Sequence, residues 1–171
     1  VDNIIMRLLD VLQAMPGIVL AIAISAALGP GLTNSVIALS ISSIPGYARM
    51  TRASILNVRK MEYLEAATSI NCSNARIIWK HVLPNALSPL IVQATMGIAG
   101  AIMGAAMLSF IGLGVQPPTP EWGAMLSAGR NYLRDYPHLC IFPGIMIMMA
   151  VLSLNMLGDG LRDALDPKLK D

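Results

Sequence analysis

Charged residues are scarce in this sequence. Only 13% of its 171 residues are Asp, Glu, Lys or Arg, whereas soluble domains carry about 25%. Hydrophobic residues make up 55% of the chain, and the mean hydropathy is +0.63. The net charge of +2 is too small to indicate a nucleic-acid partner. The deficit of charge therefore predicts a protein embedded in a lipid bilayer rather than a soluble domain with a large core.

Cysteines and catalytic motifs are also lacking. Cys72 and Cys140 lie far apart and do not have the spacing of a metal site, so we expect two free thiols and no bound metal. The sequence contains no Gly-rich loop ending in Gly-Lys-Ser/Thr, no His-Glu-x-x-His and no Gly-x-Ser-x-Gly. We therefore expect no catalytic site and no cofactor bound by this chain, and ATP is not bound in the P-loop manner.

Long charge-free runs divide the chain into membrane spans. No Asp, Glu, Lys or Arg occurs between Asp10 and Arg49, which exceeds the ~20 residues that one transmembrane helix needs. The Gly-Pro-Gly sequence at 29–31 breaks this run in its middle. Backbone in lipid must satisfy its own hydrogen bonds, so each span is expected to be helical. The sequence predicts an all-α, polytopic membrane helix bundle with spans at about 11–28, 32–48, 86–110 and 138–158.

The predicted spans contain small residues and no deeply placed charge. Gly97, Ala101 and Ala105 are spaced four apart, which lets helix backbones approach closely. Ordinary helix packing explains this spacing, and the alternative is that these helices line a transport pathway. The lack of ionisable residues argues against a proton relay, a fixed ion site or a membrane-embedded enzyme.

Lys and Arg are distributed unevenly between the two sides of the membrane. Four spans place the two ends of the chain and the polar segment 50–85 on one side, which holds ten Lys and Arg residues against two on the other. Cytoplasmic loops carry such an excess, so we expect both ends in the cytoplasm and the segment 112–137 outside. The ten are Arg7, Arg49, Arg52, Arg59, Lys60, Arg76, Lys80, Arg162, Lys168 and Lys170, and the two are Arg130 and Arg134.

A polar element in two helical parts separates the second span from the third. Apolar spacing from Arg52 to Ser69 indicates one helix, and Asn71 tolerates the left-handed conformation that ends helices. Ser73 can cap a second, short helix over residues 75–83, whose apolar side includes residues 77, 78 and 82. Pro84 is expected to stop or kink this helix. A short amphipathic helix needs a partner, either lipid headgroups or a groove of another protein.

This element resembles the "EAA" loop of permease subunits of bacterial ATP-binding-cassette importers. The matching residues are Glu65-Ala66-Ala67, Asn71, Ile77 and His81-Val82-Leu83-Pro84. The family usually has Gly at the position of Asn71, and Asn is the next-best left-handed residue. In that family the short helix is the coupling helix, which docks into a cleft of the cytoplasmic ATPase. The resemblance implies that ATPase coupling involves Glu65, Ala66, Ala67, Asn71, Arg76, Ile77, Lys80, His81, Leu83 and Pro84.

The resemblance covers essentially the whole chain. It points to the second permease type of the dipeptide, oligopeptide and nickel importers, through LGPGL at 28–32, PGYAR at 45–49, LSFIGLGVQPPTPEWG at 108–123 and NMLGDGLRDALDP at 155–167. Members of this group carry two further membrane helices upstream. The chain also begins at Val1 without a preceding Met. We therefore expect a fragment that is truncated at its N-terminus.

The resemblance implies a transporter assembled from several chains in the bacterial inner membrane. The expected partners are a homologous second permease, two cytoplasmic ATPase subunits that use ATP, and an external substrate-binding protein. Pro118, Glu121 and Trp122 are candidates for contact with the binding protein, and a purely structural outer loop is the alternative. The expected function is ATP-driven import of small peptides. Two alternatives stay open, namely import of nickel or another small solute, and a non-transporting membrane scaffold.

Overall fold

The computed structural model describes residues 2–165, which form helices and connecting loops without a strand. The predicted all-α fold is thus confirmed. The elements are α1 (Asp2–Leu12), α2 (Gly17–Leu28), α3 (Leu32–Val58), α4 (Glu62–Ser69), α5 (Asn74–Arg76), the π-helix η1 (Ile77–Val82), α6 (Leu83–Phe110), α7 (Trp122–Gly129), the 3-10 helix η2 (Arg130–Tyr132) and α8 (His138–Leu165).

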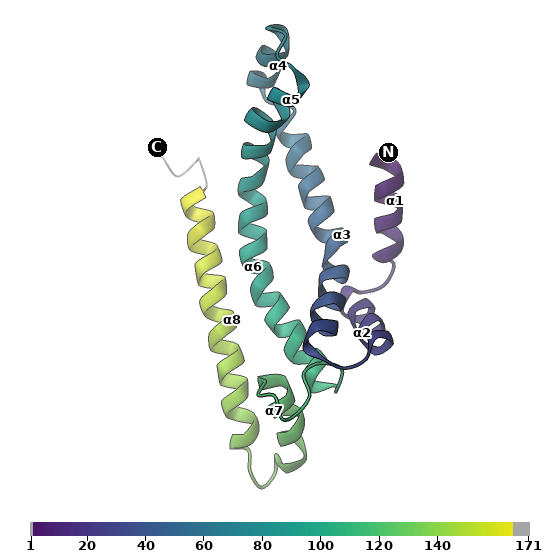
Figure 1. Ribbon diagram of the computed structural model, residues 1–171. Coiled ribbons are helices and arrows are strands. Elements are labelled where there is room, and N and C mark those ends of the chain that lie inside the picture. Colours follow the sequence, from purple (N-terminus) through teal and green to yellow (C-terminus); the bar gives the residue numbers. More distant parts are fainter. Residues whose placement is uncertain (1, 166–171) are drawn as a thin grey trace.

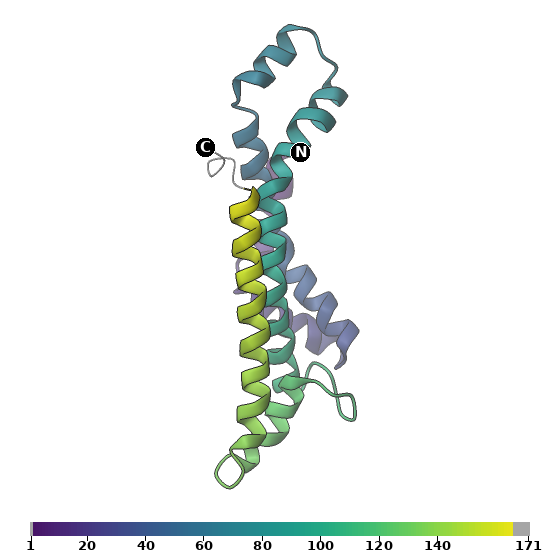
Figure 2. The same cartoon turned by 90° about the vertical axis from the view of Figure 1, so that its left-hand side faces the viewer.

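The three longest helices lie side by side along the molecule, with α6 between α3 and α8 (Figure 1). The short helices α4 and α5 lie at one end, toward which the start of α1 and the end of α8 also point (Figures 1 and 2). Helix α7 lies at the opposite end. The polar segment 50–85 and the segment 112–137 are therefore separated by the length of the long helices.

Among the described helices, two are long and apolar enough to cross a membrane, one running without a break from Asn74 to Phe110 and the other being α8. Helices α1 and α2 are long and apolar enough to cross a membrane only when they are taken together, and the pair is bent by 78°. The single helix predicted over 11–28 is thus wrong, because Pro16 cannot continue α1 and instead takes the N-cap position of α2. Helix α3 is long enough but rich in Ser, so its crossing of the membrane stays a prediction.

Two ion pairs hold α1 beside α3. Arg49 donates to Asp10, and Arg52 donates to both carboxylate oxygens of Asp2 at 2.8 to 3.0 Å. The hydrogen bonds from Arg52 lower the pKa of the Asp2 carboxyl below its ordinary value. All four side chains are substantially exposed, so these pairs orient α1 and contribute little to stability.

The helix predicted from Arg52 to Ser69 is interrupted after Val58. Met61 is extended, and α4 starts only at Glu62. Neither Gly nor Pro marks this break. Val58 and Leu64 instead turn toward each other and form a small apolar cluster with residues of the following helix, Val82 and Ala86. Burying each of the larger side chains stabilises the folded-back arrangement by roughly 1.5–3 kcal/mol, which outweighs the helical preference of the intervening residues.

Pro84 does not stop the second helix, contrary to one of the two predicted outcomes. The backbone stays helical through η1 into α6. In the wider π-helical turn, the N–H of Leu83 donates to the carbonyl of Ile78, and such a turn accommodates a proline that lacks its own N–H. The Asn85 side chain also donates to the carbonyl of His81 at 2.7 Å. The long helix therefore begins well before residue 86, where the sequence predicted its start.

The segment 112–137 contains a helix that the sequence did not predict. Helix α7 packs against both α6 and α8. A Cβ atom at Gly123 would lie 2.1 Å from the carbonyl oxygen of Ala106 in α6, and one at Gly129 would lie 3.1 Å from the carbonyl oxygen of Leu139 in α8. Glycine at these two positions allows the backbones to approach closely. The adjoining Pro117–Pro118 peptide bond is cis.

Three buried serines attach the start of the segment 112–137 to the helices. Ser25 of α2 and Ser35 of α3 both donate to the carbonyl of Leu113, at 3.2 and 3.3 Å. The hydroxyl of Ser109 in α6 accepts a hydrogen bond from the N–H of Val115 at 3.0 Å. Three separate helices are therefore joined at one short stretch of chain.

Replacing Ser109 by Ala is expected to leave the buried N–H of Val115 without a partner, at a cost of about 1–3 kcal/mol. Ser109 is 3% exposed and Val115 is 8% exposed, so water cannot readily replace the hydroxyl. The measurement is the thermal unfolding midpoint in detergent, which should fall. Ser153→Ala is the matched control because Ser153 is exposed and donates within its own helix. Equal midpoints for the two variants would contradict this prediction.

Candidate functional site

The candidate site is the loop of residues 59–82, which we call the α4–η1 loop. It projects beyond the ends of α1 and α8 at one end of the molecule (Figure 2). Its two halves are held together by the buried cluster of Val58, Leu64, Val82 and Ala86. The rings of Tyr63 and His81 also lie near each other across the loop, with centroids 6.3 Å apart and planes tilted by 46°. The loop is therefore folded around a small core that it shares with the end of α3 and the start of α6.

A left-handed turn at Asn71 reverses the chain within the loop. Asn71 has a φ of 58°, and its N–H donates to the carbonyl of Thr68 at 2.9 Å. The N–H of Cys72 donates to the carbonyl of Ala67 at 3.1 Å. This pair of hydrogen bonds is a Schellman motif, which satisfies the last carbonyl groups of α4. The left-handed conformation predicted for Asn71 is thus confirmed.

Ser73 begins the second half of the loop as predicted. Its side chain is at the N-cap of α5 and accepts a hydrogen bond from the N–H of Arg76 at 3.4 Å. The turn at Asn71 and the cap at Ser73 are separated by one residue, so the direction of the chain is set within a few residues.

The outward surface of the loop carries large apolar side chains. Ile70, Ile78 and Trp79 are 76%, 52% and 71% exposed. The sequence predicted one apolar side that includes residues 77, 78 and 82, but these residues do not share one side. Ile77 and Val82 turn inward to the cluster, whereas Ile78 turns outward. The π-helical turn explains the difference, since it shifts the register that a 3.6-residue repeat predicts. Trp79 was not among the predicted coupling residues. Its position next to Ile78 in the sequence is the signal that could have indicated an apolar outward surface.

The ten predicted coupling residues all belong to this loop or to the start of α6, but they differ in accessibility. Ala67 is buried, with 7% exposure, and lies on the inner side of α4. Residues of the exposed group have accessible side chains, whereas the side chains of the others are partly or wholly buried. The exposed ones are Glu65, Ala66, Asn71, Arg76, Lys80 and Pro84, and the half-buried ones are Ile77, His81 and Leu83.

The three residues predicted to contact a binding protein lie at the opposite end. Glu121 is half-buried, and its carboxylate caps α7 by accepting a hydrogen bond from the N–H of Ala124 at 2.7 Å. Pro118 and Trp122 are exposed. The structure therefore gives Glu121 a local structural role and leaves Pro118 and Trp122 as accessible surface.

The whole chain, residues 1–171, matches the family described as "Binding-protein-dependent transport system inner membrane component". It is 50% identical to the dipeptide transport system permease protein of Alkalihalophilus pseudofirmus over 99% of this chain and 56% of the relative. It is 50% identical to the di/tripeptide transport system permease protein of Pseudomonas aeruginosa over 98% and 55%.

A third relative is the glutathione transport system permease protein of Shigella flexneri, which is 51% identical over 99% of this chain and 56% of the relative. The chain thus spans about half the length of the curated relatives it matches. Because the family match includes every residue and residues 2–165 form a bundle of apolar helices, the chain belongs to the family of binding-protein-dependent transport system inner membrane components.

Proposed function

We propose that this chain forms part of the translocation pathway of an ATP-driven importer of small peptides. The relatives described above carry names that refer to dipeptides, di- and tripeptides, and glutathione, all of which are small peptides. These names support peptides over nickel as the cargo. The energy would come from ATPase subunits in other chains, since the sequence has no P-loop motif.

The observation that carries this proposal is the exposed apolar surface of the α4–η1 loop. An exposed Trp next to an exposed Ile on a projecting helical turn indicates a protein contact, because helices dock through such side chains into apolar grooves. Arg76 and Lys80 flank this surface and can meet acidic residues of an ATPase, and Glu65 can meet a basic one. The ATPase subunit is therefore the proposed partner of the loop.

The distribution of basic residues supports a cytoplasmic position for the loop. Of the ten residues on the basic side, Lys168 and Lys170 lie outside the described residues. The other eight belong to α1, the second half of α3, the α4–η1 loop and the last turns of α8. Arg130 and Arg134 lie next to α7 at the other end. A cytoplasmic loop and an external α7 follow from the positive-inside rule.

Two further partners complete the proposed assembly. A second, homologous permease would cover the apolar sides of the helices, and a substrate-binding protein would approach the end that carries α7. Pro118 and Trp122 are accessible there for the second contact. A scaffold without transport activity would also present an apolar loop, but it would show no dependence on ATP.

Trp79→Glu is expected to reduce ATP-driven uptake of a labelled dipeptide more than about tenfold, because a charge placed in an apolar groove loses its hydration without gaining a partner. The assay uses proteoliposomes that hold the full-length permease, its second permease and the ATPase subunits, with binding protein added. Uptake and stimulated ATPase activity are measured together with co-purification of the ATPase subunits.

Tyr132→Glu is the matched control, because Tyr132 is an aromatic residue of similar exposure, 55%, at the opposite end of the molecule. It should leave co-purification of the ATPase unchanged. Normal uptake by the Trp79 variant would show that the loop does not couple transport to ATP. Uptake by the unaltered assembly without ATP would contradict the proposed function itself.

A further inference from the structure

A buried hydrogen bond joins α3 to α6 at the base of the α4–η1 loop. The Ser54 hydroxyl of α3 donates to the backbone carbonyl of Ala86 in α6 at 3.0 Å. Ser54 is 9% exposed and Ala86 is 1% exposed, so water cannot readily replace either group. A carbonyl oxygen has two lone pairs, so it can accept this bond in addition to one within its own helix.

This bond lies directly behind the apolar cluster that holds the loop together. Ser54 comes one turn before Val58 in α3, and Ala86 is itself a member of the cluster, one turn after Val82. Apolar burial is non-directional, whereas a hydrogen bond weakens steeply when its distance or angle changes. The cluster thus keeps the two helices together, and the Ser54 hydrogen bond fixes the position of one helix along the other.

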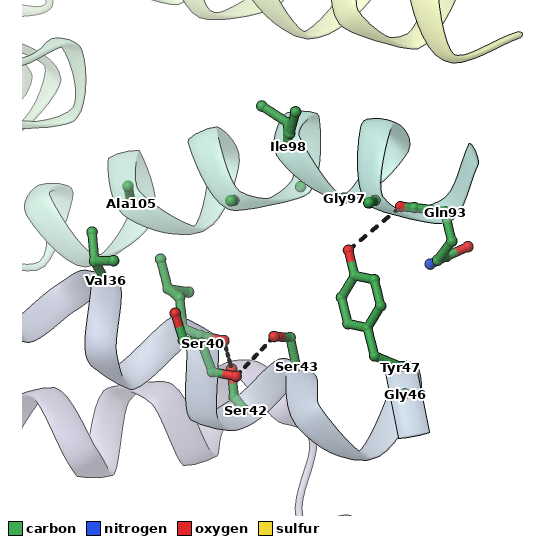
Figure 3. Close-up of a pocket in the computed structure, with 14 residues that line it drawn as sticks. Val36, Ser40, Ser42, Ser43, Gly46, Tyr47, Gln93, Gly97, Ile98 and Ala105 are labelled. Atoms are coloured by element: carbon green, nitrogen blue, oxygen red, sulfur yellow. Dashed lines mark hydrogen bonds between the residues drawn. The ribbon is translucent and has the colours of Figure 1, made fainter. Parts of the chain in front are cut away.

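Farther from the loop, the contact between α3 and α6 is looser. A groove of about 600 Å³ lies between the two helices (Figure 3). The Tyr47 hydroxyl reaches across to the carbonyl of Gln93 at 3.4 Å, which exceeds the distance of about 2.5–3.0 Å that is usual for such bonds. Ser35 of α3 donates to the carbonyl of Leu113, just beyond α6, at 3.3 Å. Among these described side-chain bonds from α3, the bond of Ser54 is therefore the shortest.

The loop is joined to the two helices in different ways. Its second half continues into α6 as one unbroken helix from Asn74 to Phe110. Its first half is separated from α3 by residues 59–61, where Met61 is extended. A displacement of η1 therefore reaches α6 through continuous helix, but it reaches α3 only through this irregular stretch or across the Ser54 hydrogen bond. Helices α1 and α2 pack on α3 and depend on the same connection.

We infer that Ser54 is a positioning residue that makes α3 follow α6 when a partner displaces the α4–η1 loop, an inference that rests on the proposed function. The proposed partner is the ATPase, which would act on Trp79 in the half of the loop that is continuous with α6. The Ser54 hydroxyl passes the displacement to α3, and thereby to α1 and α2. Without this hydroxyl, α6 moves while α3 lags, so ATP is hydrolysed with less peptide imported.

The first test is the number of peptides imported per ATP hydrolysed. In the proteoliposomes used for Trp79→Glu, Ser54→Ala should lower this ratio at least about threefold, because losing a hydrogen bond of ordinary strength shifts an equilibrium by roughly that factor or more. The ratio does not depend on how much transporter assembles. Ser54→Thr keeps the hydroxyl and should restore the ratio. Ser153→Ala is the control, because the exposed Ser153 of α8 donates within its own helix.

An unchanged ratio in Ser54→Ala would overturn the inference. A fall of uptake and ATP hydrolysis by the same factor would also overturn it, because it would indicate only a loss of folded protein. A lowered ratio that Ser54→Thr does not restore would assign the effect to side-chain shape and overturn the role of the hydroxyl. If uptake by the unaltered assembly depends on ATP while Ser54→Ala keeps its ratio, only this inference fails. If that uptake never depends on ATP, the proposed function itself fails.

The second test measures the positions of the two helices and can be read without ATP. Leu56 of α3 and Leu87 of α6 are 38% and 39% exposed and lie close to the bond in sequence. Each is replaced by Cys and spin-labelled in the full assembly, after Cys72 and Cys140 have been replaced by Ala. The distribution of distances between the labels should be narrow and unchanged by trapped ATP, and Ser54→Ala should broaden it even before ATP is added.

Two results of the distance measurement would contradict the role of Ser54. A distance that changes with trapped ATP in the protein with an intact Ser54 would show that α3 and α6 move separately. A distribution that stays equally narrow in Ser54→Ala would show that other contacts set the register of the two helices. Either result would overturn the inference.

Discussion

Gly123→Ala is expected to displace α7 and destabilise the end of the protein that carries this helix. The added Cβ would lie 2.1 Å from the carbonyl oxygen of Ala106 and 2.6 Å from its Cα. These are backbone atoms of a long helix, so they cannot rotate away as a side chain would. We expect a cost at or above the upper end of the ~1–3 kcal/mol that over-packing usually carries. The thermal unfolding midpoint in detergent should fall, and less protein should accumulate in the membrane.

Gly144→Ala is the matched control for this variant. Gly144 also lies inside a helix, but a Cβ there would meet nothing within 4 Å. Because alanine restricts the unfolded chain more than glycine does, this change should leave stability unchanged or raise it by about 0.4–1 kcal/mol. An equal decrease in the two variants would show that helix α7 does not depend on the close approach at Gly123.

Leu64→Ala is expected to unfold the α4–η1 loop while leaving the long helices intact. Leu64 is 6% exposed and belongs to a buried cluster of only four residues. Large-to-small changes at buried Leu cost about 2–5 kcal/mol, and such a small cluster has few other contacts with which to compensate. We expect faster cleavage of residues 59–82 in limited proteolysis, and with it a loss of ATPase stimulation in the full assembly.

Met61→Ala tests whether faster cleavage of the loop is specific to truncation in the cluster. Met61 is 49% exposed at the break between α3 and α4, so its truncation should leave the cleavage rate near that of the unaltered protein. If Leu64→Ala is cleaved no faster than Met61→Ala, the cluster does not hold the loop together.

Features that depend on neighbouring residues could be predicted from the sequence. The left-handed turn at Asn71 and the cap at Ser73 follow from the chemistry of single side chains next to the backbone. The all-α fold follows in the same way from long apolar runs with little charge.

Features that depend on distant contacts were not predicted. The chain bends after Val58 because Leu64 packs against residues that come later in the sequence. Helix α7 depends on the approach of Gly123 to the backbone at Ala106. In the candidate site, the outward position of Trp79 depends on the π-helical turn before Pro84. A proline in a sequence indicates a disturbance of the helix, but it does not say whether the helix stops, kinks or widens.

The uninterrupted helix from Asn74 to Phe110 has a mechanical consequence. Its 37 residues span about 55 Å at 1.5 Å per residue, so a tilt of only ~5° at one end moves the other end by about 5 Å. A partner protein bound at Trp79 would act on one end of this helix, and α7 packs on α6 near the other end through Gly123. A displacement at one end of the molecule would then reach the other through one continuous helix, without passing through a series of loops.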